Sequence, residues 1–353
     1  MLEVVSILGF SSFQDMGRSG FRSLGLSRSG AADYYAMAEG AALLDQSPNS
    51  TALELIGNGG TFNVLEDCMV ALTGATMLAS ADQKPLAWNA SHYLYKGNML
   101  NLTTQQNGRY SYLHLRGGFK APKIFNSCSA QPVAGIGQYT RPKDILAQLE
   151  NKQDPIECQK IEPFNRFDLT TFRLVESFQT RLFNQETIER FIDTEFSIDN
   201  QSSRGGVKLT HTGSGFSTSN QLKILSDVIV PGDIQMTGSG QPFVLLADCQ
   251  TMGGYPRIGC IIPPDLPAIA QLKPNKKVKF KFIAREEANR IFAEDAKSLE
   301  IIKRRCSAPI RDPEKMEDLL DFNLIDGAVW ALSLIHISEP TRPERMGGGG
   351  VGV

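Results

Sequence analysis

The stretch from Pro231 to Pro256, PGDIQMTGSGQPFVLLADCQTMGGYP, decides the fold class. Its apolar run, Phe243 to Ala247, is too short for a stable helix and lies between Pro242 and Asp248. A short apolar run between turn residues suits a buried strand. Similar runs, separated by Gly, Pro, Asn and Asp, occur on both sides, so the pattern predicts a mainly β chain.

Further strand candidates share this pattern. They are Phe62 to Thr73, Tyr93 to Leu102, Arg109 to Leu115 and Ile258 to Ile262. Near the end of the β-rich part, Val278, Phe280 and Phe282 alternate with lysines, which is typical of a half-exposed strand. Many short strands favour barrels or sandwiches over a doubly wound α/β fold.

Helical spacing of apolar residues is confined to a few segments. It predicts helices at Ala32 to Leu44, Ile145 to Leu149, Asn184 to Ile192 and Glu286 to Arg305. The last of these ends in three consecutive basic residues, which suit the negative end of a helix. Few helices are therefore expected.

Composition and charge exclude several classes of protein. The 353 residues are 41% hydrophobic and 21% charged, an ordinary globular balance, and the net charge of −2 gives no reason to expect nucleic acid or a membrane as partner. No apolar stretch could span a bilayer, and the start lacks the basic region of a signal peptide. The six cysteines have neither C-x-x-C nor metal-ligand spacing, so we expect reduced thiols, a cytoplasmic location and no metal site.

Several catalytic motifs are missing from the sequence. It contains no G-x-x-x-x-G-K-[ST] loop for phosphates, no H-E-x-x-H and no G-x-S-x-G. A serine triad has no support, because His114, one of only four histidines, falls in a strand pattern where a packed or surface residue is the better interpretation. The chain also has no Met-Lys biotin-attachment motif, so we expect no covalently bound biotin.

The first candidate cluster runs from Phe13 to Asp33 and combines polar residues with glycines that permit tight turns. Asp15 and Arg18 could recognise a polar substrate, because a guanidinium matches the geometry of a carboxylate. Ser29 and Asp33 follow in the same stretch. The alternative interpretation is a surface loop with an internal Asp15–Arg18 pair.

The second candidate cluster follows the apolar run quoted first. Asp248 could act as a base or a hydrogen-bond acceptor, and Gln250 and Thr251 could bind an amide or a carboxylate. Polar groups at the end of a rigid strand beside a glycine turn are common site geometry. The alternative is a hairpin turn whose polar residues cap backbone groups. The sequence leaves open whether the two clusters meet in space.

Both clusters resemble the signature of one family. The matching segments, in order, are Gln14-Asp15-x-Gly17-Arg18-x-Gly20, Ser29-Gly30-x-x-Asp33, Ala52-Leu53-Glu54, Ser203-Arg204-x-Gly206, Gly232-x-Ile234-Gln235 and Asp248-x-Gln250-Thr251-x-Gly253-Gly254-Tyr255-Pro256. This pattern, over about residues 10 to 285, resembles the family of 5-oxoprolinase C subunits. That family is also called KipI antagonist or allophanate hydrolase subunit 2-like, and it is related to biotin-dependent carboxyltransferases.

The resemblance implies a fold and a site. It implies two linked β-barrel-like domains, the second cyclophilin-like. The catalytic candidates are then Asp248 and Asp15. The substrate-binding candidates are Arg18, Ser29, Asp33, Gln235, Gln250, Thr251, Gly253, Gly254 and Tyr255.

The resemblance also implies an activity with partners. We expect this chain to be one component of a 5-oxoprolinase, which opens 5-oxoproline to glutamate in an ATP-dependent reaction. It would act together with the A and B subunits, and the KipI-like B subunit would be its direct contact. ATP would then be bound through the complex, and the ligand of this chain would be a small amide or carboxylate. The alternatives are a carboxyltransferase component of a biotin-dependent urea or amide carboxylase, and a regulatory protein that sequesters a KipI-like partner.

We expect four segments along the chain. They are an N-terminal β-rich domain at 1–120, a cyclophilin-like barrel at 121–285, a helical extension at 286–331 and a non-native tail at 332–353. The tail has no sustained period and ends in a low-complexity glycine run, so it is left out of functional reasoning.

Overall fold

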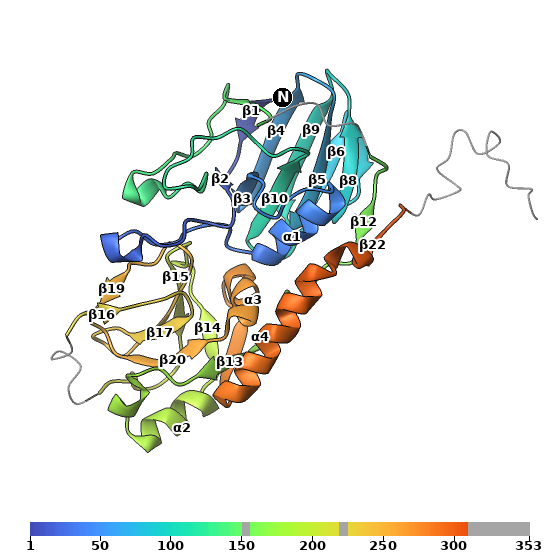
Figure 1. The fold of residues 1–353 in the computed structure, drawn as a ribbon. Coiled ribbons are helices and arrows are strands. Elements are labelled where there is room, and N and C mark those ends of the chain that lie inside the picture. Colours follow the sequence, from blue (N-terminus) through green and yellow to red (C-terminus); the bar gives the residue numbers. More distant parts are fainter. Residues whose placement is uncertain (150–155, 219–224, 310–353) are drawn as a thin grey trace, which may run out of the picture. The chain divides into compact units, whose positions relative to one another are not determined.

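The computed structural model describes residues 1–149, 156–218 and 225–309 (Figure 1). It is mainly β with few helices, which confirms the predicted fold class. In these ranges no helix has both the length and the apolar character needed to cross a membrane. The segment 310–331 of the expected helical extension and the whole expected tail at 332–353 lie outside the described residues.

Two antiparallel sheets form the N-terminal part (Figure 1). The first has the order β11 (Ile145–Leu146), β1 (Leu2–Ile7), β4 (Asn58–Val64), β9 (Met99–Gln105), β6 (Met77–Ala81) and β7 (Lys84–Leu86). The second has the order β2 (Phe10–Gln14), β3 (Ala52–Ile56), β10 (Tyr110–Leu115), β5 (Cys68–Gly74), β8 (Ala90–Leu94), β12 (Lys160–Ile161) and β22 (Cys306–Ser307). Alternate residues of both sheets, among them Leu53, Phe62 and Leu113, pack into one core.

Two of the expected long strands are each divided by a turn. The strand expected at Phe62 to Thr73 is the end of β4 followed by β5, and that expected at Tyr93 to Leu102 is the end of β8 followed by β9. The second break contains Gly97 at φ 93°, a left-handed conformation that a residue with a side chain rarely adopts. The strand expected at Arg109 to Leu115 is confirmed as β10.

Helix α1 (Tyr34–Leu43) covers one face of the second sheet and makes most of its contacts with β5 and β10. Asp33 caps its N-terminus by accepting a 3.1 Å hydrogen bond from the Ala36 amide. Gly40 lies against the His114 ring, where a Cβ would come within 2.3 Å of Nε2. His114 is fully buried, its Nε2 lies 2.8 Å from Thr73 Oγ1, and burial lowers its pKa to about 3. These contacts favour the packed interpretation of this histidine.

The barrel is the second part of the fold. It closes in the order β13 (Thr171–Val175), β20 (Arg257–Ile261), β17 (Asp233–Met236), β18 (Pro242–Leu245), β15 (Gly206–Thr210), β14 (Phe196–Ile198) and β21 (Lys277–Phe282). A parallel pairing of β13 with β21 completes the closure, and closure removes exposed strand edges. In β21, Val278 and Phe280 point into the core while the lysines are exposed, as predicted.

Short elements complete the described chain. Beside the barrel lies a two-stranded sheet of β16 (Asp227–Val228) and β19 (Met252–Gly253). The further helices are α2 (Gln185–Asp193), α3 (Leu266–Gln271) and α4 (Arg285–Glu300), with 3₁₀ turns η1 (Arg22–Leu24), η2 (Pro132–Ala134), η3 (Thr180–Leu182), η5 (Pro263–Asp265) and η6 (Ile302–Arg305).

Three of the four predicted helices are present in the structure, and one is not. Those at Ala32 to Leu44, Asn184 to Ile192 and Glu286 to Arg305 are confirmed, the last as α4 followed by η6. The helix expected at Ile145 to Leu149 is wrong, because residues 145 and 146 form strand β11 against β1. Helix α3 was not anticipated.

The strand pairing assigns the middle of the chain to the N-terminal sheets. Strand β11 pairs with β1, and β12 pairs with both β8 and β22, before β13 begins the barrel at Thr171. Residues up to Pro309 form one compact unit. The domain boundaries expected at residues 120 and 285 stay predictions.

Candidate functional site

Asp15 organises the loop that follows β2. Its Oδ1 accepts hydrogen bonds from the Gly17 amide at 2.7 Å, Ser127 Oγ at 2.7 Å and Ser129 Oγ at 2.6 Å. Its Oδ2 accepts one from the Cys128 amide at 2.7 Å. Because four donors already surround this buried carboxylate, the geometry favours an anchoring role, and the catalytic role expected for Asp15 stays a prediction.

Arg18 is the least satisfied cation near this loop. Only 2% of its surface is exposed, and its Nη2 donates to the carbonyl of Ser129. Among the described residues, its Nε and Nη1 have no hydrogen-bond partner. Burial lowers the pKa of Arg18, an effect that the carboxylates of Asp15 and Asp248 oppose. A buried donor without a partner costs free energy, so a ligand that offers acceptor oxygens would gain by meeting this guanidinium.

The two sequence clusters meet at Ser29 and Asp248. Ser29 Oγ donates to Asp248 Oδ1 at 2.5 Å. Arg204 then holds the same carboxylate in a two-point contact, with Nε 2.7 Å from Oδ2 and Nη2 3.0 Å from Oδ1. Asp248 is therefore fixed from both sides at the junction between the N-terminal part and the barrel.

Arg204 also links this pair to the N-terminal sheet. Its Nη1 donates to Glu54 Oε1, and Glu54 Oε2 accepts from the Tyr112 hydroxyl at 2.6 Å and the Ala32 amide at 2.9 Å. Burial works against the charged form of Arg204, but Glu54 and Asp248 outweigh it and raise its pKa well above its usual range. The guanidinium stays charged, which keeps Asp248 oriented.

Sequence reasoning gave neither Arg204 nor Glu54 a role in the site. Both occurred only as positions of the family pattern. A usable signal was present for Glu54, since it is the single charged residue in the apolar strand Ala52–Ile56. A lone carboxylate at a buried strand position needs a buried cation as partner.

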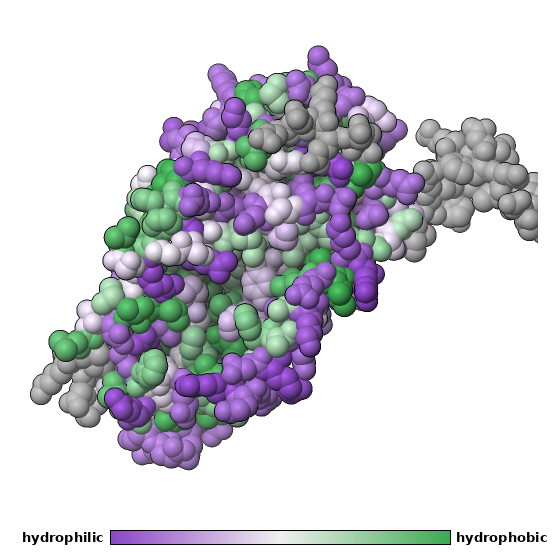
Figure 2. All heavy atoms as spheres, viewed as in Figure 1, coloured by the Kyte–Doolittle hydropathy of each residue, from purple (hydrophilic) through white to green (hydrophobic). Residues whose placement is uncertain are grey.

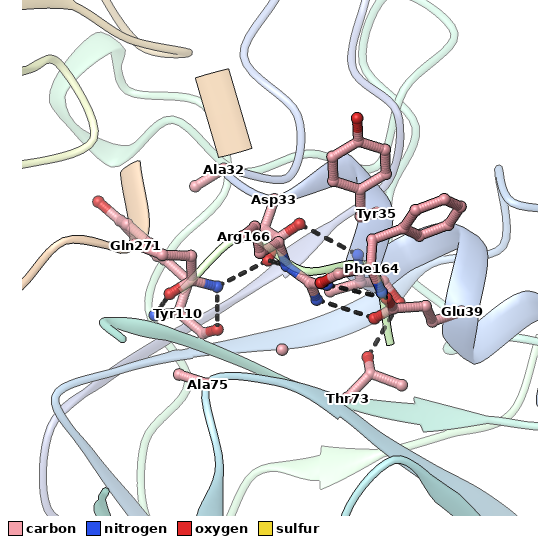
Figure 3. Close-up of polar contacts among 12 residues, drawn as sticks. Ala32, Asp33, Tyr35, Glu39, Thr73, Ala75, Tyr110, Phe164, Arg166 and Gln271 are labelled. Atoms are coloured by element: carbon pink, nitrogen blue, oxygen red, sulfur yellow. Dashed lines mark hydrogen bonds and ion pairs between the residues drawn. The ribbon is translucent and has the colours of Figure 1, made fainter. Parts of the chain in front are cut away.

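Asp33 lies in a different cluster, shown in Figure 3. Its Oδ2 accepts from Arg166 Nε at 2.6 Å and from Gln271 Nε2 at 2.7 Å. Arg166 also contacts both carboxylate oxygens of Glu39 at 2.8 Å. Burial raises the pKa of Glu39, although the Arg166 cation opposes this. Both carboxylates are fully buried, and Asp33 ties the start of α1 to Arg166 and Gln271. The substrate-binding role expected for Asp33 stays a prediction.

The remaining expected binding residues lie around β17 and β19. They are Gln235, Gln250, Thr251, Gly253, Gly254 and Tyr255. Gln235 is buried with its Nε2 unpartnered, and a Cβ on Gly253 would come within 2.6 Å of that nitrogen. Gln250 and Tyr255 are exposed. No hydrogen bond within the described ranges joins these side chains to Asp248, so their role stays a prediction.

A cavity of about 330 Å³ opens beside the Ser29–Asp248 contact. Ser29 and Ala247 form part of its wall, and α4 contributes Phe292, Asp295 and Leu299. The Asp295 carboxylate accepts hydrogen bonds from the hydroxyls of Tyr34 and Tyr35, which hold α4 over this side of the junction. The lining is mostly apolar with a few polar groups, which is usual for a small-molecule pocket. Figure 2 shows hydrophobic and pale residues alongside the hydrophilic outer face of α4.

The polar residues offer no obvious metal ligand set. Within the described part of the chain, no group of three or more His, Cys, Asp or Glu side chains could hold a metal ion. All six cysteines lie in that part and none forms a disulfide.

Comparison with known proteins identifies the family. A model of the family described as carboxyltransferase domain, subdomain A and B, matches residues 24–282. This range includes the second polar cluster and, from the first, Ser29 and Asp33 but not Asp15 or Arg18. The chain belongs to the carboxyltransferase domain family. It is 31% identical to the C subunit of 5-oxoprolinase from Haemophilus influenzae over 86% of this chain and 98% of that protein. It is 32% identical to the C subunit of 5-oxoprolinase from Escherichia coli over 82% of this chain and 93% of that protein.

More distant relatives of this carboxyltransferase-family chain are parts of much longer proteins. The urea amidolyase of Saccharomyces cerevisiae is 23% identical over 76% of this chain but only 16% of its own length. The crystal structure of the K. lactis urea amidolyase has the same fold, with a TM-score of 0.74 and 21% identity over 88% of this chain and 21% of that chain. The resemblance inferred from the sequence motifs is confirmed by these matches.

Proposed function

We propose that this chain is one component of an ATP-dependent 5-oxoprolinase complex that opens 5-oxoproline to glutamate. The 5-oxoprolinase C subunits that it resembles over most of its length support this assignment. The observation that carries the proposal is the buried Arg18 guanidinium, with two unpartnered N–H groups, close to the oriented carboxylate of Asp248. A cyclic amide that bears a carboxylate offers partners for both groups.

Each residue at the junction has a proposed role. Arg18 binds the carboxylate of 5-oxoproline, because charged hydrogen bonds to a buried guanidinium are strong. Asp248 accepts a hydrogen bond from the lactam N–H, or takes a proton from the water that attacks the lactam carbonyl and returns one to the ring nitrogen as the C–N bond breaks. Arg204 and Ser29 fix the orientation of Asp248. The apolar cavity beside Ser29 accommodates the methylene groups of the ring. Arg18, Ser29 and Arg204 are buried and the Asp248 side chain is 13% exposed, so little bulk water reaches these groups.

ATP would be bound by the partner proteins. The chain has no G-x-x-x-x-G-K-[ST] loop, and its hydrolysis of ATP is expected only in the presence of the A and B subunits. ATP would supply the free energy for opening a stable lactam. We place the complex in the cytoplasm, where six unpaired thiols would stay reduced.

The test is 5-oxoproline-dependent ATP hydrolysis by the purified A and B subunits, with and without this chain. Asp248→Asn should lower the rate about 100-fold or more, the usual contribution of a positioned acid or base. Asp199→Asn is the matched control, since Asp199 forms an ion pair with Lys208 in the barrel and does not contact the junction. Equal loss in both variants, or full activity of Asp248→Asn, would remove the proposed site.

A carboxyltransferase function is the second candidate. It is favoured by the family description and by the fold shared with urea amidolyase. In that case the chain would accept a carboxyl group from a biotin carrier in trans. Transfer of labelled bicarbonate to urea by this chain with a biotin carboxylase and its carrier would support this function. Tight binding of a KipI-like B subunit without any turnover would support the third alternative, a regulatory protein.

A further inference from the structure

The segment 120–145 has little regular secondary structure and is fixed against β1 and β2. Backbone hydrogen bonds tie it to these strands, from Ala130 to the Phe13 carbonyl at 2.9 Å and from Thr140 to the Ser11 carbonyl at 2.8 Å. Only η2 and the short β11 interrupt its irregular course. A segment fixed in this way presents a defined surface without an internal core of its own.

Large apolar side chains are exposed on this surface. Val133 at the tip of η2 is 97% exposed, and Leu8 and Phe10 in the adjoining β1–β2 turn are 67% and 60% exposed. The Phe10 ring packs on Tyr139 at 5.2 Å, and both remain open to solvent. We call the segment 120–145, together with Leu8 and Phe10, the loop surface. Figure 2 shows hydrophobic residues gathered at this side of the molecule. Exposed apolar groups clustered in this way mark interaction sites.

A cavity of about 350 Å³ lies within the loop surface. Its walls include Phe13, Ile124, Ile136 and Tyr139, with small residues of the segment 127–130 at its base. Such a cavity can receive a large apolar side chain from a partner, as the centres of protein interfaces commonly do.

The rim of the loop surface is basic. Lys120, Lys123, Arg141 and Lys143 are all exposed. The carboxylate of Asp144, which also lines the cavity, accepts the Arg141 amide at 2.7 Å. Two copies of this chain would bring like charges together at this surface, so it suits a partner with acidic side chains around an apolar protrusion.

The loop surface also contacts the candidate site through Ser127 and Ser129. Ser127 and Ser129, which line the cavity, donate to Asp15, and the Ser129 carbonyl accepts from Arg18. A partner seated in the cavity would therefore press on the segment that positions Arg18.

We propose that the loop surface docks a companion protein that inserts an apolar protrusion, surrounded by carboxylates, into the 350 Å³ cavity. This inference rests on the proposed function, because it assumes that the chain works in a complex.

The experiment uses titration calorimetry to measure binding of the full chain to the purified A subunit and, separately, to the purified B subunit. The double variant Phe10→Ser/Val133→Ser and the charge reversal Lys123→Glu should each raise the Kd for one of these two proteins about tenfold or more. Added salt should weaken the wild-type complex. Leu78→Ser and Lys277→Glu are matched controls, since Leu78 is 64% exposed on β6 and Lys277 is exposed on β21, both outside the loop surface. The controls should bind like the wild type.

The outcomes separate the two proposals. Weakened binding by the loop-surface variants supports the docking inference, whether or not the wild-type mixture hydrolyses 5-oxoproline. Failure of the wild-type mixture to hydrolyse 5-oxoproline would contradict the proposed function only. Wild-type affinity in these variants overturns the docking inference even if turnover is normal. If the chain binds neither the A nor the B subunit, the docking inference is also overturned. The same holds if light scattering shows that this chain forms a dimer and that Phe10→Ser/Val133→Ser converts the dimer to a monomer.

Discussion

Replacing Arg166 by methionine should destabilise the protein more than any surface change. The wild-type guanidinium is 1% exposed and is the shared cation of two ion pairs, with Asp33 and with Glu39, both fully buried (Figure 3). Methionine keeps the apolar volume but leaves two buried carboxylates without a cation. Breaking a buried pair in this way costs about 3–5 kcal/mol. For a unit that extends to Pro309, that corresponds to a fall in Tm of roughly 5–8 °C.

The pH dependence of this loss identifies its cause. Burial already raises the pKa of Glu39 in the wild type, and losing Arg166 raises it further. A carboxyl whose pKa is raised in the folded state contributes stability at low pH and loses it as pH rises through the folded pKa. The difference in Tm between Arg166→Met and the wild type should therefore be larger near neutral pH than at about pH 5.

Thermal unfolding followed by circular dichroism at the two pH values measures the effect. Lys208→Met is the control, since Lys208 and Asp199 form a partly exposed pair 3.6 Å apart that should contribute about 1 kcal/mol or less. Adding Glu39→Gln to Arg166→Met should restore part of the loss by removing one buried charge. A loss below about 1 kcal/mol, or one that does not change with pH, would refute this account of the cluster.

Three further predictions concern the candidate site and the thiols. Arg18→Gln should raise the KM for 5-oxoproline by roughly 10- to 100-fold while Tm changes little, because among the described residues the guanidinium gives up one hydrogen bond, to the Ser129 carbonyl, and its other two nitrogens have no partner there. Steady-state kinetics with a parallel melt would show it, and a large fall in Tm would assign Arg18 to the fold instead. Asp15→Asn should lower the free energy of unfolding, measured by urea titration, by about 1–3 kcal/mol, because it weakens hydrogen bonds to the segment 127–129. Unchanged stability would contradict the anchoring role. Burial raises the pKa of Cys249 and of Cys260 to about 12. Both thiols should therefore react with an alkylating reagent far more slowly in the native than in the unfolded protein. Equal alkylation rates, measured by mass spectrometry, would be inconsistent with the packing.

The predictable part of the fold depends on local pattern. Alternation in β21 and the apolar run in β18 identified strands because one face or both faces of a strand must be buried. The helix expected at Ile145 to Leu149 failed because residues 145 and 146 pair with β1, more than a hundred residues earlier. Two expected strands were divided because turn residues inside an apolar pattern received too little weight, as at Gly97.

Some residues of the candidate site were predictable from the sequence, whereas the parts played by Arg204 and Glu54 and the grouping of the residues were not. Ser29 and Asp248, far apart in sequence, are joined by a hydrogen bond, which the sequence could not reveal. Asp33 belongs to the same sequence stretch as Ser29, yet its partners Arg166 and Gln271 hold it in another cluster. Polar residue types indicate that a site exists, whereas distant partners decide which residues form it.

The central claim is that this chain is required for 5-oxoproline-dependent ATP hydrolysis through its Arg18–Asp248 junction. The most direct measurement compares phosphate release by the purified A and B subunits with this chain, without it, and with Asp248→Asn. The account predicts 5-oxoproline-dependent release only when the unmodified chain is present, and at most a small residual rate with the variant. Release that is the same without this chain, or the same with the variant, would contradict it.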